Sequence, residues 1–171
     1  EAFITDAHGR DHVSKATMAF DANNKIVGFK VDTIANLGAY MSLFSSSVPT
    51  YLYATLLSGQ YNIENIHCNV RTVYTNTVPV DAYRGAGRPE ACFLVERMMT
   101  IAARKLGVDS AELRRANFIR EFPHQTPVIM CYDAGDFDVS MDAAMAAADY
   151  ANFEKRKKKS AKKGMLRGIG M

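Results

Sequence analysis

The sequence predicts an α+β fold: a mostly antiparallel sheet with helices packed on one side, in two layers. Strand-like alternation of apolar and polar residues lies mainly before residue 78, whereas helical spacing dominates after residue 88. Strands that precede helices, instead of alternating with them, are typical of the α+β class. The composition, 48% hydrophobic and 23% charged over 171 residues, is that of an ordinary globular domain.

Two runs near the start of the chain predict a β-hairpin. Residues 12–22 alternate imperfectly, Asn23 and Asn24 form a turn signal, and residues 25–40 resume the alternation. Gly38 interrupts the second run, and a glycine within a strand pattern indicates a bulge or a close backbone neighbour. We also expect an edge strand of this sheet to stay open.

A short helix, a third strand and a long helix follow. Residues 48–58 place apolar side chains at helical spacing before Gly59, and residues 61–77 return to a strand-like pattern. Residues 90–106 form the strongest helical pattern of the chain, which Gly107 ends.

Two further helices are expected in the last third of the chain. Asp109 and Glu112 have the spacing of a capping box, and they begin a short helix that runs to about Phe118. Residues 122–127 are typical of a loop. The alanine-rich residues 140–159 predict one last helix.

The positive charge of the chain is concentrated near its end. The formal net charge is +3, and residues 155–163 contain seven lysines and arginines, so the rest of the chain is net negative. Only Phe153 lies nearby as a stacking aromatic, which argues against nucleic-acid binding. We expect a domain over residues 1–154, followed over residues 155–171 by a basic linker and the start of a further strand.

The number and spacing of the cysteines predict a cytoplasmic location. Cys68, Cys92 and Cys131 are odd in number, widely spaced and outside any Cys-x-x-Cys pattern. This usage predicts reduced thiols in a cytoplasmic protein and argues against a disulfide framework or a zinc site. No apolar run approaches the ~18 residues that a membrane helix requires, so no membrane partner is expected.

The most informative stretch is residues 76–90, Asn-Thr-Val-Pro-Val-Asp-Ala-Tyr-Arg-Gly-Ala-Gly-Arg-Pro-Glu, which combines a strand end, a glycine loop and a helix start. Gly85 and Gly87 permit positive φ and close backbone approach, and the proline that follows suits a first helical turn. With Arg84 and Arg88 on either side, the helix dipole makes this a site for an anionic group. The third glycine of a dinucleotide fingerprint and the lysine of a phosphate loop are both missing. A tight connection with two solvated arginines is the alternative.

Residues 83–91, Tyr-Arg-Gly-Ala-Gly-Arg-Pro-Glu-Ala, resemble the active-site loop of molybdenum hydroxylase large subunits. This is the family of xanthine dehydrogenase, aldehyde oxidoreductase and the carbon monoxide dehydrogenase large chain. Other segments resemble the family in the same order: residues 6–12, 36–40, 59–63, 75–79, 109–119 and 132–137. Because the family's large subunits are several times longer, the resemblance implies a fragment of the molybdopterin-binding subunit.

The resemblance implies cofactor contacts for five residues of the loop: Tyr83, Arg84, Gly85, Ala86 and Gly87. Arg84 would lie beside the oxygen and sulfur ligands of molybdenum, where a fixed cation stabilises negative charge. No residue of this chain is expected to bind the metal directly. The family's catalytic glutamate lies in a later half, so no catalytic residue is expected here and the fragment would be inactive alone.

The resemblance also bears on the substrate. Gly85 stands where copper-containing carbon monoxide dehydrogenases carry a cysteine, and Ala86 where xanthine oxidases carry a stacking phenylalanine. It therefore implies hydroxylation of an aldehyde or an N-heterocycle with water-derived oxygen, with Ala86 at the substrate. Arg10 falls near a family arginine that orients substrate, and a surface or domain-junction salt bridge is its alternative role.

The implied cofactor is a molybdenum–pterin, as molybdopterin or its dinucleotide form. Iron–sulfur and FAD groups would be carried by partner domains or chains. The other implied partners are the rest of the molybdenum subunit and a small-molecule substrate. The competing hypothesis is a non-catalytic α+β interaction module that binds an acidic partner through the basic tail. In either case, self-association through uncovered apolar surface is expected.

Two details of the residues are left open by the sequence. Glu96 lies within the long helical run and is expected either to be a buried partner of Arg84 or Arg88, or to be a helix-surface carboxylate. The four histidines lack zinc-protease spacing, and solvated or hydrogen-bonded imidazoles are expected.

Overall fold

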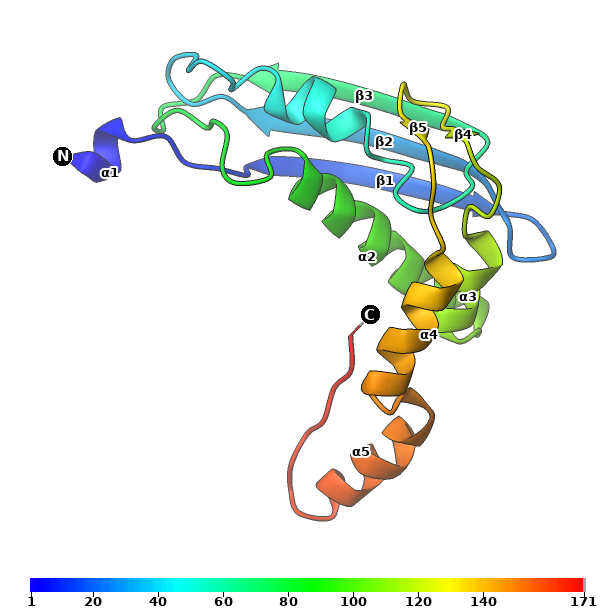
Figure 1. Ribbon diagram of the computed structural model, residues 1–171. Helices are drawn as coiled ribbons and strands as arrows, with labels where there is room; N and C mark the ends of the chain where they lie inside the picture. The colour runs from blue at the N-terminus through cyan, green and yellow to red at the C-terminus, as the bar shows by residue number, and fades with distance from the viewer. Residues whose placement is uncertain (171) are drawn as a thin grey trace.

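The computed structural model describes residues 1–170, apart from the side chains of residues 2 and 3 (Figure 1). The strands are β1 (His12–Phe20), β2 (Ile26–Asn36), β3 (Ile66–Val73), β4 (His124–Gln125) and β5 (Cys131–Tyr132). The α-helices are α1 (Ala2–Thr5), α2 (Arg88–Leu106), α3 (Ser110–Asn117), α4 (Phe137–Ala147) and α5 (Phe153–Ala161). A π-helical turn, η1 (Val48–Leu52), and a 3-10 turn, η2 (Tyr150–Asn152), complete the set.

The predicted hairpin is present as the antiparallel pair of β1 and β2. The Asp21 carboxylate accepts hydrogen bonds from the amides of Asn23 and Lys25 at 2.8 and 2.7 Å, and Asn24 has a positive φ of 61°. Asparagine tolerates this left-handed conformation, and an aspartate that bonds the following backbone closes such a turn.

The main sheet has the strand order β1-β2-β3, and its second pair is parallel. The α+β class is confirmed, but the sheet is mixed where a mostly antiparallel one was expected. Residues 37–65 form the connection and contain η1, so the chain crosses over before β3 begins. Such a crossover allows parallel pairing, whereas a short hairpin turn would impose the antiparallel arrangement.

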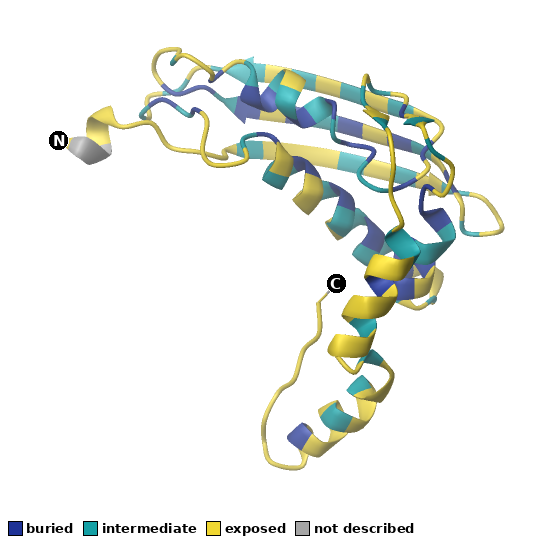
Figure 2. Ribbon diagram, in the orientation of Figure 1, coloured by how far each residue is buried: buried dark blue, intermediate teal, exposed yellow. Residues whose placement is uncertain are grey.

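One face of this sheet is covered and the other is open, which gives the expected two layers. Phe29, Val31, Thr33 and Ala35, alternate residues of β2, are buried beneath η1 and α2 (Figure 2). Side chains of opposite orientation, such as Lys30, are exposed. Along α2 the buried residues recur every four positions, at Ala91, Val95, Met99 and Ala103. This spacing places one stripe of the helix against the sheet.

Of the predicted capping box, the Asp109 N-cap is confirmed at the start of α3, whereas the exposed Glu112 side chain lies near Arg115. The Asp109 carboxylate accepts from the amides of Ala111 and Glu112 at 2.8 and 3.1 Å, which satisfies two of the free donors of the first turn. Gly107 ends α2 in the left-handed conformation, with φ of 70°. The sequence located both boundaries because each depends on residues within a single turn.

The predicted last helix is divided. α4 ends at Ala147, Asp149 adopts a φ of 49°, and α5 begins at Phe153. Arg156 donates hydrogen bonds to the carbonyls of Ala148 and Asp149 at 2.7 and 2.8 Å. These bonds satisfy carbonyls that a continuous helix would have used internally, so they stabilise the break.

A smaller difference concerns the loop after α3. Residues 122–127, expected as loop, contain β4, which pairs with β5 in a two-stranded hairpin. Among the described residues, no helix combines the length and apolar character needed to cross a membrane.

Candidate functional site

Backbone hydrogen bonds hold the chain before the glycine turn against two earlier segments. The His8 amide donates to the Pro79 carbonyl at 2.8 Å, and the Asp81 amide donates to the His8 carbonyl at 2.7 Å. The Val80 amide donates to the Leu37 carbonyl at 3.2 Å. The loop therefore has a defined path before it reaches Tyr83.

Asn36, at the end of β2, connects several of these segments. Its amide nitrogen donates to Asp11 and Thr77 at 2.9 and 3.1 Å, and its oxygen accepts from Gly38 and Thr75 at 2.7 and 2.8 Å. Four bonds use the full capacity of this side chain. Asn36 thus joins the start of β1 to the end of the β3 region.

Gly38 is the close-approach position that its place in the sequence predicted. It has a φ of 81°, and a Cβ on this residue would lie 2.3 Å from the carbonyl oxygen of Val78. Only glycine permits the two backbones to lie this close. The prediction of a close backbone neighbour is confirmed.

Gly85 and Gly87 form the turn that leads into α2. Their φ angles are 80° and 83°, and the Arg88 amide donates to the Gly85 carbonyl at 2.9 Å. A Cβ at Gly87 would lie 2.5 Å from the backbone of Leu52, which packs the turn on η1. Pro89 occupies the first helical turn, where its missing N–H leaves no bond unmade.

The turn presents a cation to the surface. Arg84 and Gly85 are exposed, Ala86 is half-buried and Gly87 is buried. Within residues 1–170, no hydrogen bond or ion pair is made by the Arg84 guanidinium; only its carbonyl is bonded, to Arg10. An exposed guanidinium on a turn that leads into the positive end of α2 fits an anionic group.

The Asp81 carboxylate connects the segment before the turn to the segment around Phe44. Burial raises the pKa of its carboxyl, but hydrogen bonds from the Ser42 side chain and from the amides of Ala82 and Phe44 outweigh burial, and the net pKa is lowered. The carboxylate therefore stays charged and holds the segment around Phe44 to the loop.

Arg10 comes from a distant part of the sequence and meets the loop directly. Its Nη2 donates to the Arg84 carbonyl at 2.8 Å, and its guanidinium carbon lies 4.7 Å from the centre of the Tyr83 ring. Its Nε lies 3.9 Å from Oε1 of Glu90. The structure thus brings together Arg10 and the predicted cofactor residues, and the salt bridge that was its alternative role is present.

A cavity of about 640 Å³ lies between β1 and the start of α2. Its lining residues are Arg10, His12, Val13, Ser14, Tyr53, Pro89, Glu90, Phe93 and Leu94. The His12 ring lies edge-on to Tyr53, with the ring centres 5.2 Å apart. Burial lowers the pKa of His12, although the carboxylates of Glu90 and Asp11 act in the opposite direction. Within the described residues, His12 Nδ1 and Glu90 Oε2 are buried and lack a hydrogen-bond partner.

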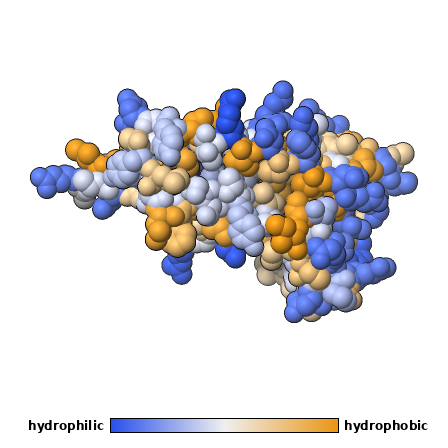
Figure 3. All heavy atoms as spheres, turned by 90° about the horizontal axis from the view of Figure 1, so that it is seen from above, coloured by the Kyte–Doolittle hydropathy of each residue, from blue (hydrophilic) through white to orange (hydrophobic). Residues whose placement is uncertain are grey.

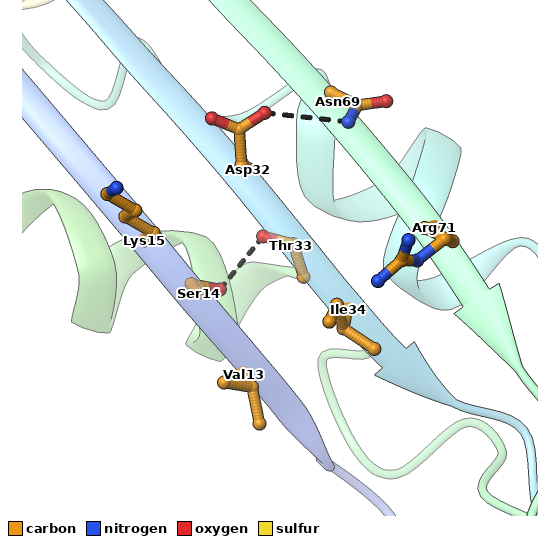
Figure 4. A pocket seen from close by; sticks show the side chains of 8 residues that line it. All are labelled: Val13, Ser14, Lys15, Asp32, Thr33, Ile34, Asn69 and Arg71. Carbon is orange, nitrogen blue, oxygen red and sulfur yellow. Dashed lines mark hydrogen bonds between the residues drawn. The ribbon is translucent and has the colours of Figure 1, made fainter.

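A second hollow, of about 340 Å³, lies on the open face of the sheet (Figure 4). Side chains of both charges line it, among them Lys15, Asp32 and Arg71, and Asn69 donates to Asp32 at 3.5 Å. The helices lie behind the sheet in this view. The groove contains none of the predicted site residues.

Glu96 is neither a partner of Arg84 or Arg88 nor a plain surface carboxylate. Its Oε2 pairs with the buried Arg114 of α3 at 2.8 Å, and its Oε1 accepts from the Tyr61 hydroxyl at 2.7 Å. Burial and the adjacent carboxylate raise the pKa of Tyr61. Glu96 therefore joins α2 to α3, away from the glycine turn.

Sequence reasoning missed Glu90, Asn36 and Asp81 as parts of the site. Glu90 carried a signal, because a carboxylate in the first turn of a helix after a proline is favoured by the helix dipole. Asn36 and Asp81 had no comparable signal, since their partners come from several segments.

Within residues 1–170, no group of three His, Cys, Asp or Glu side chains is arranged to hold a metal ion.

Comparison with known proteins gives a consistent result. Residues 1–118 match the family model of the molybdopterin cofactor-binding domain. The carbon monoxide dehydrogenase large chain of Hydrogenophaga pseudoflava is 37% identical over 155 residues, which cover 88% of this chain and 19% of that protein. The nicotine 6-hydroxylase large subunit of Paenarthrobacter nicotinovorans is 29% identical over 173 residues, covering 100% of this chain and 21% of that protein. The chain thus spans about a fifth of the length of these relatives.

Solved structures show the same fold. Reconstituted CO dehydrogenase from Oligotropha carboxidovorans matches with a TM-score of 0.84 and 29% identity, covering 95% of this chain and 21% of that one. Quinoline 2-oxidoreductase from Pseudomonas putida 86 matches with a TM-score of 0.87 at 23% identity, and that likeness concerns the fold alone. The family model, the relatives and the exposed arginine–glycine turn agree: the chain belongs to the molybdopterin cofactor-binding domain family of the molybdenum hydroxylases.

Proposed function

We propose that this chain forms one wall of the molybdenum–pterin pocket in a molybdenum hydroxylase-type oxidoreductase. The observation that carries the proposal is the turn from Arg84 to Gly87, which leads into the positive end of α2 and whose exposed Arg84 guanidinium has no partner within residues 1–170. An anionic group placed there gains a charged donor and the helix dipole. The match of residues 1–118 to the cofactor-binding domain supports this interpretation.

In this proposal the residues of the turn have separate roles. Arg84 supplies a fixed cation for negative charge at the cofactor, and such preorganised donors stabilise a transition state more than a ground state. Gly85 lacks a side chain and lets the cofactor approach the backbone, while Gly87 keeps the turn packed on η1. Tyr83 would border the cofactor, and Ala86 the substrate. When bound, the molybdenum–pterin group would supply the oxidation of a carbon centre with water-derived oxygen.

The proposed substrate is an aldehyde or an N-heterocycle. Ala86 is half-buried and offers only a methyl group, so it leaves room beside the turn and cannot stack on a planar ring. Gly85 carries no sulfur with which to hold copper. A relative with 29% identity is named a nicotine 6-hydroxylase large subunit, and nicotine contains an N-heterocycle.

The proposal includes partners that this chain does not contain. Electrons would leave through iron–sulfur and FAD groups on other domains or subunits, and the catalytic glutamate would come from another part of the subunit. Relatives are named as subunits of larger assemblies, such as the 6-hydroxypseudooxynicotine dehydrogenase complex. By itself the chain would be inactive.

We also place the protein in the cytoplasm, because Cys68, Cys92 and Cys131 are free thiols.

Replacement of Arg84 in the complete subunit tests the proposal. In Arg84→Ala, kcat toward an aldehyde or N-heterocycle should fall by more than about tenfold, because a charged transition-state donor is lost. Molybdenum and pterin content, measured by metal analysis and by fluorescence of the oxidised pterin, should show that the subunit is still loaded. Arg97→Ala, on an exposed position of α2, is the matched control. A wild-type rate in Arg84→Ala would remove Arg84 from the site.

The basic segment supports a second candidate function. The lysines of α5 and of the residues just after it are mostly exposed, as an interaction module for an acidic partner requires. Such binding would weaken steeply with salt. Titration with an acidic peptide at low and high salt, in a chain with Lys157, Lys158 and Lys159 replaced by glutamine, tests this alternative. Unchanged peptide binding in that variant would remove it.

A further inference from the structure

The contacts of Arg10 lead beyond the proposed function, on which the following inference rests. We propose that Arg10 is a positioning residue whose guanidinium clamps the turn that carries Arg84, with the buried carboxylate of Glu90 as its anchor. The sequence resemblance implied instead that Arg10 binds substrate. The geometry assigns it to the loop.

Arg10 contacts the loop on both sides of the two glycines. It lies over the Tyr83 ring at 4.7 Å and donates to the Arg84 carbonyl at 2.8 Å, both before Gly85. It meets Glu90 at 3.9 Å, after Gly87. One guanidinium thus spans the turn, with a ring contact and a hydrogen bond before the two glycines and an ion pair after them.

The backbone around Arg10 is fitted to the loop. Arg10 has a φ of 65°, a left-handed conformation that a residue with a long side chain seldom adopts without stabilising contacts. The residue before it, Gly9, has no room for a side chain, because a Cβ there would lie 2.6 Å from Cβ of Tyr83. The segment therefore packs closely against the ring that Arg10 covers.

Glu90 explains why Arg10 stays in place. The Glu90 side chain is only 8% exposed, and its second oxygen has no hydrogen-bond partner within residues 1–170. A buried carboxylate requires compensation of its charge. Arg10 and the dipole at the start of α2 supply this compensation, so the pair fixes the guanidinium relative to the helix that follows the turn.

These engagements leave Arg10 little freedom to act as a substrate ligand. One face of its guanidinium and two of its three nitrogens are directed at Tyr83, Arg84 and Glu90. Its effect on the reaction is therefore expected to pass through Arg84. Displacement of a catalytic group by about 1 Å can lower a rate on the order of a hundredfold.

Hydrogen exchange in the complete subunit tests the clamp without reference to turnover. In Arg10→Gln, amides of residues 82–88 should exchange at least about tenfold faster than in the wild type, because the turn opens locally. Arg97→Gln is the matched control and should leave the same peptide unchanged. Arg10→Lys keeps a cation for Glu90 but loses the planar guanidinium, so exchange should be faster in this variant as well. It serves as the test if Arg10→Gln does not fold. Wild-type protection in both Arg10 variants overturns the clamp.

Kinetics in the loaded subunit separate positioning from substrate binding. Arg10→Gln should lower kcat by about tenfold or more with KM nearly unchanged, and should cause no further loss in an Arg84→Ala background. A raised KM, or a full additional loss in that background, means that Arg10 binds substrate and overturns the proposal. Wild-type turnover in Arg84→Ala alone would instead refute the proposed function, while hydrogen exchange would still decide whether Arg10 clamps the turn.

Discussion

Gly85 and Gly87 have almost the same φ, yet different forces exclude a side chain at each. A Cβ at Gly85 would meet side-chain atoms of Pro89 at 3.5 Å, an ordinary contact, so backbone strain alone opposes substitution. A Cβ at Gly87 would lie 2.5 Å from the backbone of Leu52, and a clash is added to the strain. Backbone atoms of η1 cannot move aside as a flexible side chain can.

These differences predict the effects of two alanine substitutions. Gly85→Ala should destabilise the chain by about 1–2 kcal/mol, the cost of a left-handed alanine. Gly87→Ala should cost at least about 3 kcal/mol, because overpacking is added to the same strain. Urea unfolding followed by circular dichroism measures both. Equal losses would contradict the contact between Gly87 and Leu52.

His12 should make stability depend on pH. Burial lowers its pKa in the folded chain, despite the carboxylates of Glu90 and Asp11 nearby. Below about pH 6.5 the unfolded chain binds a proton that the folded imidazole does not, so stability falls as pH decreases through this range. The loss ends once the folded imidazole is also protonated.

The measurement compares unfolding free energies at about pH 7.5 and about pH 5.5, on either side of the ordinary histidine pKa. His12→Gln should lose less stability between these values than the wild type. His67→Gln, at an exposed position of β3, is the control and should behave as the wild type does. A wild-type pH dependence in His12→Gln would show that His12 is not responsible.

Among the elements, α2 and α3 are joined by an ion pair whose arginine is buried. Arg114 is 2% exposed and bonds Glu96 at 2.8 Å, the Glu96 carbonyl at 3.2 Å and the Ser110 carbonyl at 3.1 Å. Tyr61 adds a hydrogen bond to the same carboxylate. A buried guanidinium with this many acceptors is costly to disrupt from one side.

Removal of one partner should therefore be strongly destabilising. Arg114→Ala should cost roughly 2–4 kcal/mol, because a large buried side chain is removed and the carbonyls of Ser110 and Glu96 lose a donor. The Glu96 carboxylate, by contrast, is 34% exposed and keeps the Tyr61 hydrogen bond. Arg97→Ala, on the exposed side of α2, should cost less than about 1 kcal/mol. The free energy of unfolding measures both, and a small effect of Arg114→Ala would show that water replaces the lost donor.

At the scale of the whole molecule, the C-terminal helices form an arm that extends away from the sheet (Figure 1). α4 and α5 each contribute one buried residue, Met141 and Ser160. The arm is attached by Met141, which belongs to the core cluster, and by Phe137, Met145 and Tyr150, which pack against that cluster. Arg115 also pairs with Asp138 at 3.0 Å, and the Tyr150 hydroxyl donates to Asp109 at 2.9 Å. These attachments lie in α4 and η2, before α5 begins.

Hydrogen exchange should reveal this uneven stability. Amides of α5 should exchange faster than those of residues 91–103 in α2 by at least roughly two orders of magnitude, because α5 opens without disturbing the core. Mass spectrometry of peptides from the two helices provides the comparison in one sample. Equal protection would mean that the arm is part of the cooperative unit.

On the face seen from above (Figure 3), apolar surface is not gathered in one patch. Seen from above, hydrophobic residues lie in separate groups among polar ones (Figure 3). Leu43, Phe93 and Val13 are 83%, 71% and 71% exposed. Val13 and Phe93 line the cavity between β1 and α2, and Leu43 lies in the connection between β2 and η1.

The sequence by itself determined the features that depend on neighbours along the chain. The Asn23-Asn24 turn, the Asp109 cap, the Gly107 helix end and the arginine–glycine turn all arise from local backbone preferences and short-range hydrogen bonds. Helical and strand-like spacing located the longer elements for the same reason. The boundaries after Ala147 were missed because Arg156, eight residues beyond Ala148, stabilises the break.

Only the tertiary structure decided which distant groups meet. Parallel pairing of β2 with β3 depends on the crossover through η1, and Glu96 finds Arg114, 18 residues away, instead of the nearer Arg84 or Arg88. Arg10 reaches the carbonyl of Arg84 across 74 positions of sequence. Residue types and spacing contain no signal for such contacts, because packing of whole elements brings the partners together.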